Sequence, residues 1–200
     1  MRSIEHSAAD AVRAKLPANK SFHPLPTVKC DGTVLFRNQA ARDVGCLLDV
    51  DQTVLSWQCQ PLNHGGHPEQ GTPDFLVVHI DGSQHFLDAP DRKPSETTFR
   101  ERLPGEYRQL SHDEVYEGFR LQNARDLLQY GRWRTSLGDR VRLLTALDEN
   151  GSLTLAECLG AIQETKPIAG IAALILSGLI EVDLDEALLG PETTVRRIRL

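Results

Sequence analysis

A hairpin-like stretch, TPDFLVVHIDGSQHFLDAP from Thr72 to Pro90, constrains the fold of this chain more than any other segment. Its two halves are rich in β-branched and aromatic residues, and Asp81-Gly82 between them is a strong turn signal. One acid stands near each open end, Asp74 at the front and Asp88 at the back. Because antiparallel pairing brings the open ends of a hairpin together, the sequence predicts two neighbouring carboxylates.

The register of this hairpin decides whether the two acids share a face of the sheet. A two-residue turn at Asp81-Gly82 pairs Asp74 with Ala89 and puts Asp88 on the opposite face. A three-residue turn pairs Asp74 with Pro90 and puts Asp88 on the same face as Asp74. Both registers fit the sequence, and only the second permits a shared site.

Helical and strand patterns alternate along the rest of the first two thirds, which indicates an α/β (α+β) protein. Apolar spacing predicts helices over residues 4–16, after an N-cap at Asn38, and over Ser111–Tyr130, which opens with the capping box Ser-His-Asp-Glu. Strands are predicted within Asp31–Arg37 and over Thr53–Gln60.

The last third of the chain has a different character. From about residue 137, three short helical units are followed by two strand-like tails, the pattern of a small winged-helix-like domain. We therefore divide the chain into an N-terminal helical segment (1–20), a mixed domain (21–136) and a C-terminal domain (137–200).

Composition excludes some classes of protein. No apolar run approaches the roughly 20 residues that cross a bilayer, and the N-terminus lacks the hydrophobic region of a secretory signal. We therefore expect a cytoplasmic protein with no membrane partner. The four cysteines are far apart and form no CxxC pair, which favours scattered, reduced thiols over a zinc site.

The distribution of charge limits contact with nucleic acid. The net charge of −6 argues against a chain whose whole surface attracts phosphate. Residues 89–137 are the exception, with 9 basic and 8 acidic side chains. The candidates for DNA contact there are Arg92, Lys93, Arg100 and Arg102, and the alternative is that these charges are solvated and balanced by neighbouring acids.

The order of a strand, a helix, VLSWQCQPL, a loop and TPDFLVV…DG…FLDAP resembles the catalytic domain of TnsA-type transposon endonucleases. These enzymes belong to the PD-(D/E)xK restriction-endonuclease-like superfamily. The segment YRQLSHDEVYEGFRLQNARDLLQYGR and the last third resemble the family's C-terminal helical domain, so the similarity runs from about Thr33 to Arg197. It implies a restriction-endonuclease-like mixed sheet flanked by helices, followed by the winged-helix-like domain. It also implies DNA, a transposase and an AAA+ ATPase as partners and Mg²⁺ as cofactor.

The resemblance assigns the site residue by residue. Asp74 matches the acid of the PD motif and Asp88 the second acid, so these two are the expected catalytic and metal-binding residues. Ala41 stands where the family's helix carries glutamate, and Pro90 stands where it carries lysine. A methyl group cannot bind a metal and proline offers neither charge nor donor, so we expect a catalytically impaired subunit that acts through DNA and protein contacts.

Two other functions fit the same residues. In an active Mg²⁺-dependent endonuclease, Lys93 of the tripeptide Asp91-Arg92-Lys93 would replace the missing lysine, although Pro90 separates it from the strand. In a DNA-binding regulator, the nuclease fold would serve recognition alone.

Other acids and histidines have weaker claims to a site. Asp43 could replace the helix acid, but a solvated charge or a charge in the N-terminal turn is the simpler interpretation. His64, His67 and Glu69 could form a metal site in their glycine-rich loop, although surface residues are more common at such positions.

Overall fold

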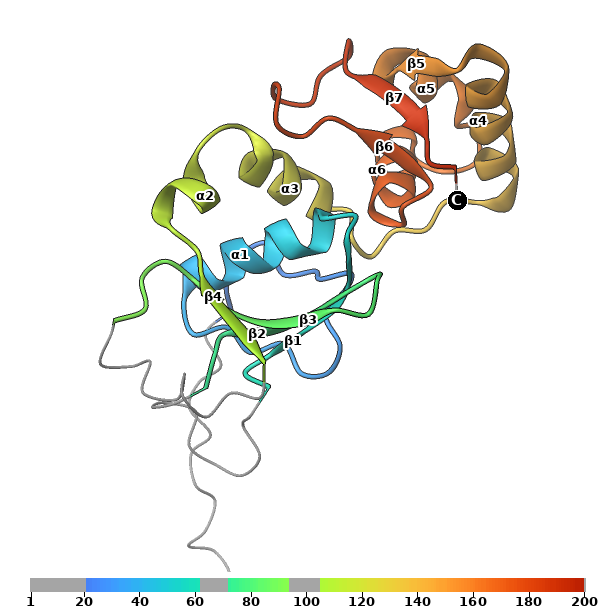
Figure 1. The fold of residues 1–200 in the computed structure, drawn as a ribbon. Helices are drawn as coiled ribbons and strands as arrows, with labels where there is room; N and C mark the ends of the chain where they lie inside the picture. The colour runs from blue at the N-terminus through green and yellow to red at the C-terminus, as the bar shows by residue number, and fades with distance from the viewer. Residues whose placement is uncertain (1–20, 62–71, 94–104, 200) are drawn as a thin grey trace, which may run out of the picture.

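The computed structural model describes residues 21–61, 72–93 and 105–199. These residues form a mixed α/β structure with a four-stranded sheet, a three-stranded sheet and several helices (Figure 1). The helix predicted over residues 4–16 lies outside the described residues. Within the described part of the chain, no helix combines the length and apolar character needed to cross a membrane.

The four-stranded sheet contains the predicted hairpin and is mixed, as expected. Its strands, in spatial order, are β1 (Val54–Cys59), β2 (Phe75–His79), β3 (Gln84–Asp88) and β4 (Glu106–Gln109). Strand β2 runs antiparallel to both β1 and β3, whereas β4 runs parallel to β3. The predicted strand over Thr53–Gln60 corresponds to β1.

The hairpin register differs from both predicted pairings of Asp74. Phe75 pairs with Leu87, so continuing the register places Asp74 opposite Asp88 itself. The turn has three residues, 80–82, but begins one residue earlier than expected. Asp81 accounts for the shift. Its Oδ1 accepts from the N–H and the hydroxyl of Ser83 (2.9 and 2.7 Å), which stabilises a turn that ends at Gly82. The two acids therefore share a face.

Helix α1 (Gln39–Val50) lies between the four-stranded sheet and helix α3 (Arg120–Leu128), as Figure 1 shows. The predicted N-cap is confirmed, since the Oδ1 of Asn38 accepts from the N–H of Ala41 at 2.9 Å. The apolar side of α1 packs on the inner face of the sheet around Trp57 and Phe75, both fully buried. This layer is the main hydrophobic core of the first part of the chain.

Two sequence predictions near this core are wrong in part. The helix expected over Ser111–Tyr130 is two helices, α2 (His112–Tyr116) and α3, because Gly118 adopts a φ of +73° between them. The capping box at Ser111 is present. The strand expected within Asp31–Arg37 is absent; Cys30 makes an isolated bridge to Trp57, and Gly32 at φ +90° then turns the chain away.

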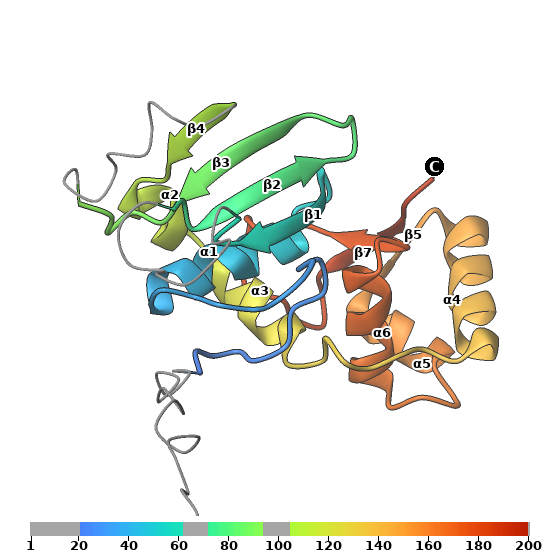
Figure 2. The ribbon, with the colours of Figure 1, turned by 90° about the horizontal axis from the view of Figure 1, so that it is seen from below.

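The last third contains three helices, as predicted, and three strands rather than two. In chain order they are α4 (Leu137–Asn150), β5 (Ser152–Thr154), α5 (Leu155–Ala161), α6 (Pro167–Leu176), β6 (Ile180–Val182) and β7 (Thr194–Arg197). The strands form an antiparallel sheet in the order β5-β7-β6. A separate core fills this part, which lies beside α3 (Figure 2). Leu127 of α3 packs with Ala172 and Leu184 in a third cluster.

Candidate functional site

Asp74 and Asp88 lie together at the open end of the hairpin, and both are buried. The side chain of Asp88 is fully enclosed and Asp74 is 4% exposed. The N–H of Asp74 donates to Oδ1 of Asp88 at 2.7 Å, and the N–H of Ala89 donates to Oδ2 of Asp74 at 3.0 Å. Each carboxylate thus accepts from the backbone of the opposite strand, which fixes the two side chains next to each other.

Arg37 binds Asp74 through one edge of its guanidinium. Its Nε lies 3.1 Å from Oδ1 and its Nη2 lies 3.0 Å from Oδ2, a bidentate arrangement. Arg37 immediately precedes the N-cap of α1, so the start of the helix positions it. The same guanidinium also contacts Asp91, with Nη2 2.9 Å from Oδ1. Burial lowers the pKa of Arg37, but the bonds to Asp74 and Asp91 outweigh burial and raise it.

Arg92 supplies a second positive charge to the same two acids. Its Nε and Nη2 each lie 3.2 Å from an oxygen of Asp88, and Nη2 lies 3.6 Å from Oδ1 of Asp74. The hydroxyl of Tyr107 on β4 donates to Oδ2 of Asp88 at 2.7 Å. Arg92 is only 8% exposed, so the structure places this candidate for DNA contact inside the protein.

These residues do not fit a bound Mg²⁺ ion. Each of the four carboxylate oxygens of Asp74 and Asp88 already accepts from an arginine, a tyrosine or the backbone. The two guanidinium groups supply the positive charge that a divalent cation would bring. Burial, together with the charge of Asp74, raises the pKa of Asp88, so this carboxylate depends on a nearby cation for its charge.

The expected third ligand and the lysine are missing from this arrangement. Ala41 is buried in α1 and presents only a methyl group, and Pro90 follows the end of β3. Within the described ranges, no group of three His, Cys, Asp or Glu side chains is placed to hold a metal ion. Lys93 is exposed and lies beyond the end of the strand. Arg100, Arg102, His64, His67 and Glu69 lie outside the described residues.

Asp43 is buried, which corrects the expectation of a solvated charge. Its carboxylate accepts from Arg125 at 2.7 Å, from Gln39 at 2.8 Å and from the hydroxyl of Tyr116 at 3.1 Å. Asp43 therefore links α1 to α2 and α3.

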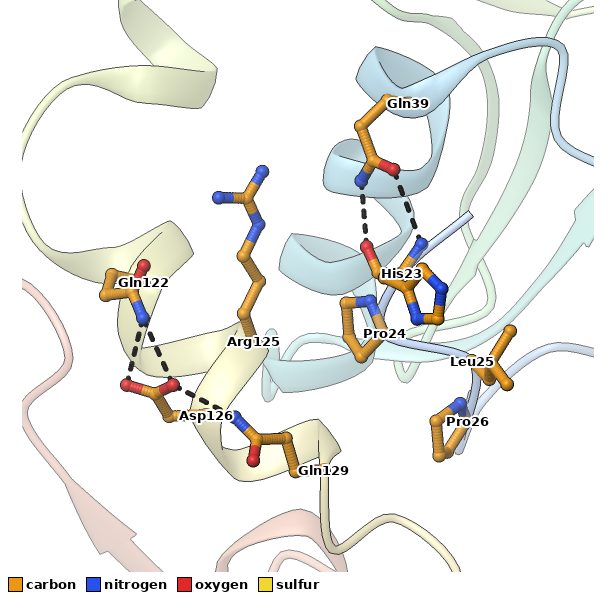
Figure 3. A pocket seen from close by; sticks show the side chains of 9 residues that line it. All are labelled: His23, Pro24, Leu25, Pro26, Gln39, Gln122, Arg125, Asp126 and Gln129. Carbon is orange, nitrogen blue, oxygen red and sulfur yellow. Dashed lines mark hydrogen bonds between the residues drawn. The ribbon is translucent and has the colours of Figure 1, made fainter. Parts of the chain in front are cut away.

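A pocket of about 690 Å³ lies between residues 23–26, the start of α1 and α3 (Figure 3). It contains neither Asp74 nor Asp88. Figure 3 shows most of its polar groups bonded to one another: Gln39 to the backbone of His23, and Gln122 and Gln129 to Asp126. Of its charged residues, Arg125 is paired with Asp43, and Asp126 accepts from Gln122 and Gln129.

Comparison with protein-family models gives no match to the chain, and comparison with curated proteins gives none. The similarity to TnsA-type endonucleases therefore stays a prediction, and the geometry of the paired acids is the basis for assigning a function.

Proposed function

We propose that this chain is a nuclease-fold protein, similar to TnsA-type endonucleases, that has little or no hydrolytic activity. It acts through contacts with DNA and protein partners in transposition or a related DNA-processing system. The observation that carries this proposal is the pairing of Arg37 and Arg92 with the buried acids Asp74 and Asp88.

Metal-dependent phosphodiester hydrolysis needs a cation held by carboxylates and a positive group near the attacking water. In this chain the carboxylates hold arginines instead, and Ala41 and Pro90 supply neither a ligand nor a charge. The arginines join the start of α1 and the segment after β3 to the open end of the hairpin. In the proposed scaffold, Asp74 and Asp88 thus serve as a structural link and not as metal ligands.

The fold gives further support. The mixed sheet and the shared face of Asp74 and Asp88 agree with the arrangement that the family resemblance implies. The division into segments 1–20, 21–136 and 137–200 is part of the proposal. For the last of these, three helices with an antiparallel three-stranded sheet support a winged-helix-like domain.

The surface of the C-terminal part favours a protein partner over DNA. A pocket of about 900 Å³ beside β6 and β7 is lined by Glu181, Asp183, Glu186 and Glu192, with Arg196 as its basic residue. Negative charge at this density repels a phosphate backbone. We therefore assign this part to contact with a partner such as the transposition ATPase, and assign DNA contact to the first part of the chain.

The proposal predicts that purified protein leaves supercoiled plasmid intact in the presence of Mg²⁺ or Mn²⁺. Hydrolysis is not expected because both acids that would hold the metal are bound to arginine. Gel electrophoresis of the plasmid over several hours is the measurement, and the Asp74→Ala variant is the matched control, expected to give the same result.

Metal-dependent nicking that Asp74→Ala abolishes would overturn the proposal. If Lys93→Ala also abolished such nicking, the active endonuclease with a relocated lysine would be correct. A mobility-shift assay on the same preparation tests the binding part separately. Retention of DNA should fall steeply as salt rises, and no retention at low salt would remove DNA from the list of partners.

A further inference from the structure

Two cysteines that are far apart in the sequence lie on the same side of the edge strand β1. The segment around Cys30 runs parallel to β1: the N–H of Trp57 donates to the carbonyl of Lys29 at 3.1 Å, and the N–H of Asp31 donates to the carbonyl of Trp57 at 2.8 Å. Cys30 therefore faces Trp57 across this bridge. Cys59 follows Trp57 by two residues and so points to the same face of the strand.

The two thiols are neighbours on this face of β1. Both Cys30 and Cys59 pack against the main core, and both are partly exposed. The influence of each thiol on the other lowers the pKa of Cys59 and raises that of Cys30. Cys59 is thus the better nucleophile of the pair, with Cys30 placed to react after it.

We propose that Cys30 and Cys59 are a site of reversible oxidation, forming an intramolecular disulfide by exchange with a small-molecule disulfide such as oxidised glutathione. This inference does not depend on the proposed function. Cys46 and Cys158 are buried in different cores and are not part of the site.

The exchange takes place in two steps that balance. The thiolate of Cys59 attacks one sulfur of the small disulfide, the S–S bond breaks, and the leaving thiolate takes up the proton that Cys59 gave to solvent. Cys30 then loses its proton and attacks the sulfur of Cys59, which releases the second small thiol. Two protein thiols are oxidised and one small disulfide is reduced to two thiols.

The bond would fasten the chain ahead of α1 to an exposed sheet edge. The same segment already donates from the N–H groups of Val28 and Lys29 to the buried carboxylate of Asp49, at 3.2 and 3.0 Å. Oxidation would add a covalent link beside these hydrogen bonds and close a loop of about 30 residues, which restricts the unfolded chain. The oxidised protein is therefore expected to be the more stable form.

The experiment treats the full-length protein with oxidised glutathione under native conditions, blocks the remaining thiols with N-ethylmaleimide after denaturation, and maps peptides by mass spectrometry. Before blocking, the expected product is about 2 Da lighter than the reduced protein; after blocking, it carries a Cys30–Cys59 link, and Cys46 and Cys158 are alkylated. Its Tm should be about 5–10 °C above that of the reduced protein.

Two variants make the outcome decisive. Cys30→Ser should stop at the mixed disulfide of Cys59 with glutathione and show no such rise in Tm. Cys46→Ser, the control, should form the link as the unaltered protein does. Four blocked thiols after treatment, or a link that involves Cys46 or Cys158, would overturn the proposal.

Discussion

Replacing Arg92 by methionine is expected to lower the free energy of unfolding by about 3–5 kcal/mol, the usual cost of leaving a buried charge without its partner. Asp88 is fully enclosed, and Arg92 contacts both of its oxygens at 3.2 Å. Methionine retains much of the arginine's length and apolar volume, so the change in the free energy of unfolding reports the removal of the charge. Urea denaturation gives the change directly, and Tm should fall by about 6–20 °C.

The neighbouring Lys93 provides the matched control. It has the same charge and lies one residue further along, but it is exposed. Lys93→Met should change the free energy of unfolding by no more than about 0.5 kcal/mol. Equal stabilities for the two variants would show that Arg92 is not needed to neutralise the paired acids.

Replacing Trp57 by alanine is expected to cost about 4 kcal/mol or more. The side chain is fully buried and meets Phe75 edge to face, with ring centroids 5.5 Å apart. Its Nε1 also donates to Oδ1 of Asp49 at 3.0 Å. Alanine removes both the packing and a hydrogen bond to a buried carboxylate.

Two other variants separate these contributions. Trp57→Phe retains most of the ring volume and removes the indole donor, so its loss of unfolding free energy should be intermediate. Leu55→Ala lies in the same strand at a position that is 60% exposed, and should cost about 0.5 kcal/mol or less. A Trp57→Ala protein as stable as Leu55→Ala would contradict this description of the core.

The sequence predicts the hairpin and the proximity of its acids because strand alternation and the Asp81-Gly82 turn signal are local features. It does not predict the register, because the side chain of Asp81 bonds to Ser83 and moves the turn by one residue. The role of Arg37 is also hidden from the sequence, since its partner Asp74 is distant along the chain. Arg92 lies only four residues after Asp88, and a turn after β3 brings the two side chains together.

Burial accounts for another difference. The sequence alone suggests a solvated charge at Asp43, but the residue is buried and pairs with Arg125 from a later helix. The break at Gly118 was visible as a glycine within the predicted helix, and its positive φ is what divides α2 from α3. Local sequence patterns thus predict most helices and strands, whereas the partners of buried charges depend on tertiary contacts.

The central claim is that arginines occupy the cation positions around Asp74 and Asp88, and the most direct test is calorimetric titration of the purified protein with Mn²⁺. The expected result is no binding heat at millimolar Mn²⁺ beyond that of the Asp74→Asn variant, since neither acid is free to bind a metal. Stoichiometric binding by the unaltered protein that disappears in Asp74→Asn would contradict the claim.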